Sequence, residues 1–150
     1  MPIVLGVSKA CDPATDLDGE TYDHLVGLQS PVNSPLVRQG VPVECPNKQF
    51  NIGGTLPLKL ELACGNHTLS GDEIDVNPEI IGLVHETLGP VSLAGFNDFS
   101  NANPDDMFMV CGSNGCEFEG RTDELTPGGH VITIRMPDSR LFEACFTMRF

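Results

Sequence analysis

Hydrophobic and polar residues alternate most regularly in the run Leu56–Cys64. Every second position holds a leucine or, at the end, a cysteine, and both charged residues of the run lie between them: Leu56, Leu58, Leu60, Leu62 and Cys64 alternate with Pro57, Lys59, Glu61 and Ala63. Successive side chains of a strand point to opposite faces of a sheet. The run therefore predicts a half-buried strand with its leucines inward and its charges outward.

Two further runs near the C-terminus have the same period. His130–Met136 alternates after the turn Pro127-Gly128-Gly129, and we expect His130 to be a surface or rim residue at the start of that strand. Leu141–Phe150 places five hydrophobic residues on one face, namely Phe142, Ala144, Phe146, Met148 and Phe150. The short connection between the two runs predicts that they are antiparallel neighbours.

Weaker patterns predict additional strands. Met107–Cys111 and Cys116–Glu119 flank the turn-forming residues Gly-Ser-Asn-Gly, which is typical of a hairpin. Ile3–Ser8 forms a short candidate strand. Val41–Cys45 is a candidate edge strand, because Pro42 has no amide hydrogen to donate to a ladder.

A helix is predicted over residues 78–88. Asn77 is a suitable N-cap and a proline follows at the first helical position. Ile80, Val84 and Leu88 recur at helical spacing, and a glycine follows them. Gly82 weakens this prediction, because glycine disfavours a helix interior. A buried strand over Ile80–His85 is the alternative.

These patterns together predict an all-β protein. We expect a single small antiparallel β-barrel or sandwich of about seven strands with one short helix over 78–88. A length of 150 residues predicts one domain over 1–150. A hydrophobic content of 40% and a charged content of 19% are typical of a globular protein and not of a disordered one.

The charge balance excludes several classes of partner. Twenty-one acidic residues stand against eight basic ones, and the net charge is −13. Nucleic acid and an anionic membrane surface would both repel such a chain. No apolar stretch is long enough to span a bilayer, so we expect no membrane insertion.

Six cysteines are dispersed along the chain, at Cys11, Cys45, Cys64, Cys111, Cys116 and Cys145. None forms a C-x-x-C pair or stands at zinc-finger spacing from a histidine. The even number favours up to three disulfides over free buried thiols, which remain the alternative. Cys111 and Cys116 flank a hairpin turn and could bond locally. Each could equally pair with a distant cysteine, and the connectivity stays open.

Disulfides predict an oxidising compartment, so we expect a secreted, extracellular protein. Met1–Leu5 does not have the features of a signal peptide, which leaves a removed leader or another export route.

Asn66-His67-Thr68 is an N-glycosylation sequon in a predicted turn, and a surface position there would allow its use.

Familiar catalytic patterns are absent from the sequence. The four histidines stand singly, and no zinc-protease, nucleophile-elbow or phosphate-loop pattern occurs. His24, beside a tyrosine and an aspartate, is a weak candidate general base. Asp16–Glu20 is similar to a calcium loop, but Ala14 and Leu25 would occupy its first and last ligand positions and cannot supply side-chain oxygens. We therefore assign no catalytic, cofactor-binding or metal-binding residues and expect no cofactor.

The chain as a whole is similar to a known class of proteins. It begins with Met-Pro-Ile-Val-Leu-Gly-Val-Ser-Lys-Ala-Cys and ends with Glu-Ala-Cys-Phe-Thr-Met-Arg-Phe. With these ends, the chain resembles hypersensitive-response-inducing elicitors of the rice blast fungus in size, acidity, cysteine number and β pattern. These are small secreted fungal effectors. The resemblance implies a compact β-barrel that plant cells perceive, with local cell death and defence as the response. It supplies no catalytic residues.

We therefore expect a protein, monomeric in solution, that acts by recognition at an unidentified component of the plant cell surface. The candidate recognition loops are Cys11–Asp23, Ser30–Gly40 and Gly95–Asp106. Two alternatives from other classes remain. One is a cell-wall glycan hydrolase whose catalytic carboxylates converge only in the folded chain. The other is a β module that binds calcium or sugar without chemistry.

Overall fold

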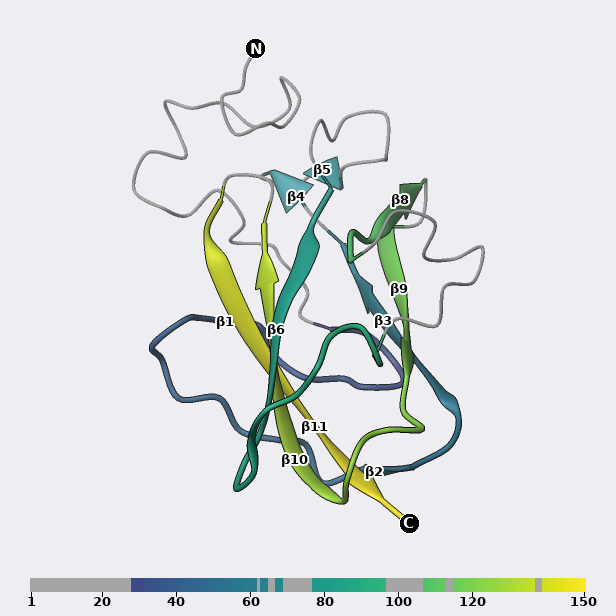
Figure 1. The fold of residues 1–150 in the computed structure, drawn as a ribbon. Coiled ribbons are helices and arrows are strands. Elements are labelled where there is room, and N and C mark those ends of the chain that lie inside the picture. The colour runs from purple at the N-terminus through teal and green to yellow at the C-terminus, as the bar shows by residue number, and fades with distance from the viewer. Residues whose placement is uncertain are drawn as a thin grey trace.

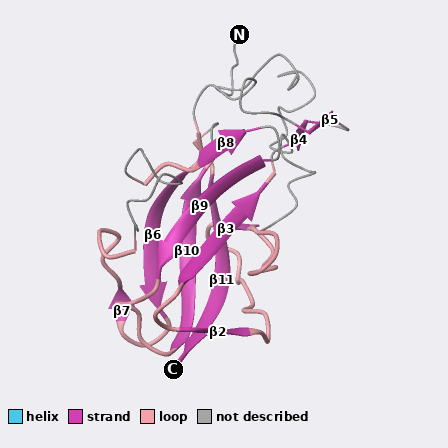
Figure 2. Ribbon diagram, turned by 90° about the vertical axis from the view of Figure 1, so that its right-hand side faces the viewer, coloured by secondary structure: helices cyan, strands magenta, loops and turns pink. Residues whose placement is uncertain are grey.

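The computed structural model describes residues 28–61, 63–64, 67–68, 77–96, 107–112, 115–136 and 139–150. Several predicted features lie outside these residues: the strand Ile3–Ser8, the acidic segment Asp16–Glu20, His24, Cys11, the sequon at Asn66 and the side chain of Cys64. The described part consists of strands and loops and contains no helix (Figure 2). The protein is therefore all-β in this part, as predicted.

A six-stranded sheet forms the larger half of the structure. Its strands follow the order β1 (Val37–Arg38), β11 (Leu141–Arg149), β10 (Gly128–Arg135), β6 (Glu79–His85) and β7 (Gly89–Pro90), all antiparallel, and β2 (Gln49–Asn51) adds to β11 in parallel. Figure 1 shows β11, β10 and β6 running side by side along the molecule. The predicted antiparallel pairing of the two C-terminal runs is confirmed.

Strand β11 shows the predicted alternation along most of its length. Phe142, Ala144, Phe146 and Met148 are buried. The strand ends at Arg149, and Phe150 beyond it is 92% exposed, so the expectation that Phe150 continues the inward face is wrong. Cys145 is also buried, although it lies on the other face, because the disulfide described below covers it.

A second sheet has the strand order β3 (Thr55–Leu60), β9 (Gly115–Arg121) and β8 (Val110–Gly112), all antiparallel. The leucine run forms β3, with Leu56, Leu58 and Leu60 buried, so the predicted strand is confirmed over this part. The predicted hairpin is β8–β9. Beyond β3, β4 (Ala63–Cys64) pairs separately with β5 (His67–Thr68).

The helix predicted over 78–88 is wrong, and its alternative is correct: this segment forms β6. The pairing of β6 with β10 shifts between Thr133 and Ile134, which accommodates an extra residue in β6. Ile80, Leu83 and His85 consequently turn inward, while Val84 is 41% and Leu88 68% exposed. Ile80, Val84 and Leu88 therefore do not form one buried face, although they recur at helical spacing.

The segment Val41–Cys45, predicted as an edge strand, forms no strand. It lies in the connection between β1 and β2, and a disulfide at Cys45 holds it to β11. This cross-link ties the segment to the sheet without a ladder of backbone hydrogen bonds.

Both sheets contribute to one hydrophobic core. Phe96 lies at their junction, with its ring 5.9 Å from that of Phe118 in β9 and 6.3 Å from that of Phe146 in β11. Gly120 makes room for Phe96, because a side chain there would collide with the ring. The strands of the described residues do not close into a barrel. The structure thus has an open arrangement of sheets that meet through this core.

Candidate functional site

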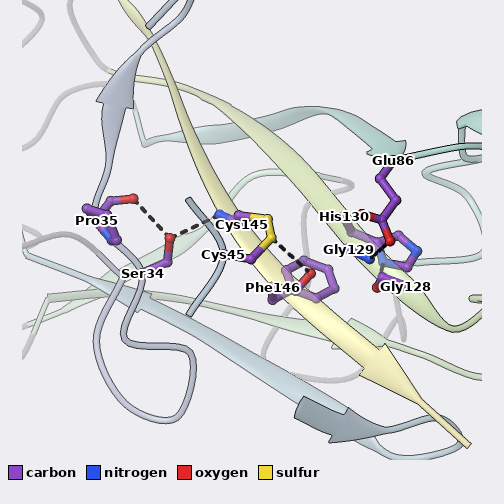
Figure 3. The surroundings of a disulfide bond; sticks show 9 residues. All are labelled: Ser34, Pro35, Cys45, Glu86, Gly128, Gly129, His130, Cys145 and Phe146. Atoms are coloured by element: carbon purple, nitrogen blue, oxygen red, sulfur yellow. Dashed lines mark hydrogen bonds between the residues drawn. A yellow bond between two sulfur atoms is a disulfide. The ribbon is translucent and has the colours of Figure 1, made fainter. Parts of the chain in front are cut away.

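The segment 28–36 joins the two sheets. Its Gln29 amide donates to the carbonyl oxygen of Lys59 in β3, at 2.8 Å. The hydroxyl of Ser34 accepts from the amide of Cys145 in β11 and donates to the Pro35 carbonyl oxygen, each at 3.0 Å (Figure 3). Because Val32 and Ser34 are buried, the predicted recognition loop Ser30–Gly40 is in its first half a structural bridge.

The loop of residues 39–48, between β1 and β2, is fastened to β11 at three places. At its start β1 pairs antiparallel with β11, and at its end β2 pairs with β11 in parallel. Between them Cys45 is disulfide-bonded to Cys145, with 4.7 Å between the Cα atoms (Figure 3). We call this segment the pinned loop. Figure 1 shows it projecting from the edge of the larger sheet.

The pinned loop presents mostly exposed residues. Exposed positions are Gln39, Gly40, Val41, Pro42, Glu44, Asn47 and Lys48. Val41, an apolar residue, is 48% exposed. A loop that is exposed and also cross-linked to a sheet can present a fixed surface, which reduces the entropy cost of binding.

A pocket of about 340 Å³ lies at the start of the pinned loop, between it and the turn that joins β10 to β11. Its described lining residues are Arg38, Gln39, Ser139, Arg140 and Leu141. The Gln39 amide donates to the Leu141 carbonyl oxygen at 3.0 Å, which holds one wall against the other.

Both pocket arginines contact the same aromatic ring. The guanidinium carbon of Arg38 lies 5.7 Å from the centroid of the Phe142 ring, and that of Arg140 lies 5.5 Å from it. Both distances are within the range of cation–π attraction. Sequence reasoning did not single out these arginines, because they are far apart in the chain and belong to no spacing motif.

Two histidines form a buried pair at the other end of the larger sheet. His85 in β6 is opposite His130 in β10, and their rings meet edge to face with centroids 4.9 Å apart. The amides of Thr87 and Leu88 both donate to Nδ1 of His85 at 3.1 Å. The proton of the neutral ring is therefore on Nε2, which donates to the Pro127 carbonyl oxygen at 2.7 Å.

His130 is fully buried, so its predicted position at the surface or rim is wrong. Its ring stacks on Phe146 with 5.4 Å between centroids, and Nδ1 donates to the Gly128 carbonyl oxygen at 3.1 Å. Nε2 has no hydrogen-bond partner among the described residues. The strand begins two residues earlier than the sequence indicates, which carries His130 into the core.

Burial lowers the pKa of His130, because a charged ring is poorly solvated there. The hydrogen bond to Gly128 and the charge of Glu86 oppose this effect, and the nearby His85 adds to it. Glu86 accepts a hydrogen bond from the Gly129 amide at 2.8 Å (Figure 3). Neither histidine is among the described pocket-lining residues. Both rings of the pair are buried, and His130 packs on Phe146.

Four of the six cysteines have described side chains, and all four are in disulfides. Cys45–Cys145 joins the pinned loop to β11, and Cys111–Cys116 closes the β8–β9 hairpin, with 3.9 Å between its Cα atoms. The local bond considered from the sequence is therefore confirmed. These two disulfides are consistent with an oxidising, extracellular compartment.

The described residues give little structural support for the other functions considered, which are metal binding and glycan hydrolysis. No group of three or more potential metal ligands occurs among them. Within the same residues, no helix has the length and hydrophobicity needed to cross a membrane. The described lining of the pocket includes no carboxylate, so it does not supply the acid pair of a glycan hydrolase.

Comparisons of the chain with protein-family models, with curated proteins and with solved structures find no match.

Proposed function

We propose that this protein is a secreted elicitor that plant cells recognise at their surface, with local cell death and defence as the response. It acts by binding and not by catalysis. It does so as a monomer that presents a fixed surface to a plant cell-surface component. The resemblance of the sequence to fungal elicitors motivates the biological role, and the geometry supports a recognition surface on the pinned loop.

The observation that carries this proposal is the fastening of the pinned loop. Two strand pairings and the Cys45–Cys145 disulfide hold an exposed loop against β11. An exposed loop left free would lose conformational entropy on binding, at a cost of about 1–2 kcal/mol for each ordered residue. Fastening removes part of that cost before the partner arrives. Both disulfides also support export to an oxidising compartment.

The proposal is tested by infiltrating leaves with purified protein and scoring local cell death. The wild type should elicit a response. A variant that combines Val41→Asp with Glu44→Lys alters two exposed residues of the pinned loop and should elicit a much weaker one. Leu88→Asp is the matched control, because Leu88 is 68% exposed beside β7, outside the pinned loop. It should act like the wild type.

Three results would overturn parts of this proposal. An inactive wild type would exclude the elicitor role. Equal activity of the folded loop variant would exclude the pinned loop as the recognised surface. Turnover of a plant cell-wall polysaccharide by the purified protein would instead favour the hydrolase alternative, for which the described residues supply no acid pair in the pocket.

A further inference from the structure

We propose that the buried pair of His85 and His130 is a pH-sensitive switch that controls how firmly the pinned loop is held. Protonation opens the end of the larger sheet that supports the disulfide at Cys45. An open state with rings accessible to water takes up protons and gains population as the pH falls. This inference concerns how the loop is held in the protein itself. It goes beyond the proposed recognition by plant cells and does not depend on it.

His130 has a basic nitrogen in a place that offers an added proton no acceptor. The ring is fully buried on Phe146, its Nδ1 donates to the Gly128 carbonyl oxygen, and its Nε2 has no hydrogen-bond partner among the described residues. A proton on Nε2 would be a buried charge beside a second imidazole, 4.9 Å away between ring centroids. Opening this end of the sheet lets water solvate the ring and avoids that cost.

The charged groups around His130 do not remove this cost. From β6 and the residue after it, His85 and Glu86 act on the ring, and β11 faces it with the uncharged ring of Phe146. Residues 127–129, just before it in the chain, carry no titratable side chain. Burial lowers the pKa of His130, and the charge of Glu86, an exposed residue, opposes this effect without overcoming it.

His85 ties the turn after β6 to the turn before β10. Its Nδ1 accepts from the amides of Thr87 and Leu88, each at 3.1 Å, and its Nε2 donates to the Pro127 carbonyl oxygen at 2.7 Å. A proton added to Nδ1 would remove both amide bonds and leave the Thr87 hydroxyl, at 3.3 Å, as the acceptor within reach. Protonation of His85 would therefore release the turn between β6 and β7.

Glu86 joins the same two turns through two further hydrogen bonds. Its amide donates to the Gly129 carbonyl oxygen at 2.9 Å, and its carboxylate accepts from the Gly129 amide at 2.8 Å. The rings of His85 and His130 pack beside these bonds (Figure 3 shows Glu86, Gly129 and His130 together). Displacement of either ring therefore disturbs the backbone at the start of β10.

The disulfide at Cys45 rests on that part of the backbone. Its Sγ atom lies 4.0 Å from the carbonyl oxygen of Phe146, the residue paired with His130 (Figure 3). A Cβ atom at Gly129 would lie only 3.3 Å from the same sulfur, so Cys45 packs directly on the backbone near the start of β10. Movement of this backbone removes support from the pinned loop.

The first test measures amide hydrogen exchange by NMR, as protection relative to an unstructured chain at the same pH. The amides of Glu86 and Gly129 report on the switch, and those of the β3–β9 pairing report on the rest of the molecule. Below about pH 6.5, protection at the switch should fall by up to about tenfold per pH unit for each proton that opening takes up. Protection in the β3–β9 pairing should fall less.

Two variants identify the group that takes up the proton. His130→Phe keeps an aromatic ring on Phe146 and cannot titrate, so protection at the switch should depend far less on pH than in the wild type. Glu86→Gln is the control, because it keeps a side-chain acceptor for the Gly129 amide and also cannot titrate. It should retain the pH dependence of the wild type.

A second readout tests whether the switch reaches the pinned loop. A water-soluble phosphine reduces a disulfide to two thiols and is oxidised to the phosphine oxide with the oxygen of water. The rates of reduction of Cys45–Cys145 and Cys111–Cys116 are compared in the same molecule by alkylation and mass spectrometry. The ratio of the first rate to the second should rise as the pH falls in the wild type, and should rise far less in His130→Phe.

The proposal is overturned if protection at Glu86 and Gly129 follows that of the β3–β9 pairing at every pH, because opening would then be global. It is equally overturned if folded His130→Phe keeps the pH dependence, if Glu86→Gln loses it, or if the ratio of reduction rates does not change with pH. Exchange and reduction of the wild type decide the question if His130→Phe does not fold.

Discussion

The buried His130 ring is the residue whose environment differs most from what the sequence indicated. Its Nδ1 donates to Gly128, and its Nε2 faces the interior without a partner among the described residues. Protonation of Nε2 would place a charge in that interior. His130 opened a predicted strand, and nothing in the alternation revealed that Gly128 and Gly129 extend the strand and draw the ring inward.

His130 should make stability depend on pH. Its pKa is lowered in the folded state, so the unfolded chain binds more protons as the pH falls through about 6.5, its ordinary pKa. The stabilising contribution of the neutral ring is present above that pH and is lost towards the lowered pKa.

His130→Phe keeps a ring on Phe146 and cannot titrate. Urea unfolding between about pH 5.5 and pH 7.5 should show a smaller loss of stability on acidification for this variant than for the wild type. Equal slopes of stability against pH would contradict this assignment, whatever the absolute stability of the variant.

At the scale of elements, strict alternation of hydrophobic and polar residues predicted strands correctly, whereas helical spacing of hydrophobic residues predicted a helix that is not there. The runs that form β3, β10 and β11 alternate with period two, and β10 pairs antiparallel with β11 as predicted. In β6 an extra residue shifts the pattern, so the spacing of its apolar residues imitates a helix. The pocket could not be predicted, because Arg38 and Arg140 meet only through the pairing of β1 with β11.

A pair of alanine variants distinguishes the strand from the helix at β6. Leu83 is buried and Val84 is 41% exposed, whereas the helical pattern placed Val84 on the inner face. Leu83→Ala should lower the free energy of unfolding by about 2–5 kcal/mol. Val84→Ala should change it by about 0.5 kcal/mol or less. Urea unfolding of both variants measures this, and a larger loss for Val84→Ala would contradict the strand.

At the scale of the whole molecule, the two disulfides found among the described residues differ in what they constrain. Cys45–Cys145 links residues 100 apart in sequence, and Cys111–Cys116 links residues 5 apart. In the chain-entropy account a cross-link stabilises by restricting the unfolded chain, and the effect grows with the length of the closed loop. The long link should therefore contribute more to global stability than the hairpin link.

Paired cysteine variants measure this difference. Replacing Cys45 and Cys145 with alanine should lower the free energy of unfolding by about 4 kcal/mol, and replacing Cys111 and Cys116 by about 2 kcal/mol. Denaturant unfolding of both double variants provides the comparison. A larger loss for the hairpin pair would show that loop closure is not the main contribution of these bonds.

The most direct test of the central claim, recognition of a disulfide-held shape, compares native protein with protein that has been fully reduced and alkylated. Both are infiltrated into leaves at the same dose, after intact mass has verified that every cysteine of the reduced sample is modified. The native protein should cause local cell death and the reduced protein should not. Full activity after verified reduction would mean that the response does not require the fold, and would contradict the account.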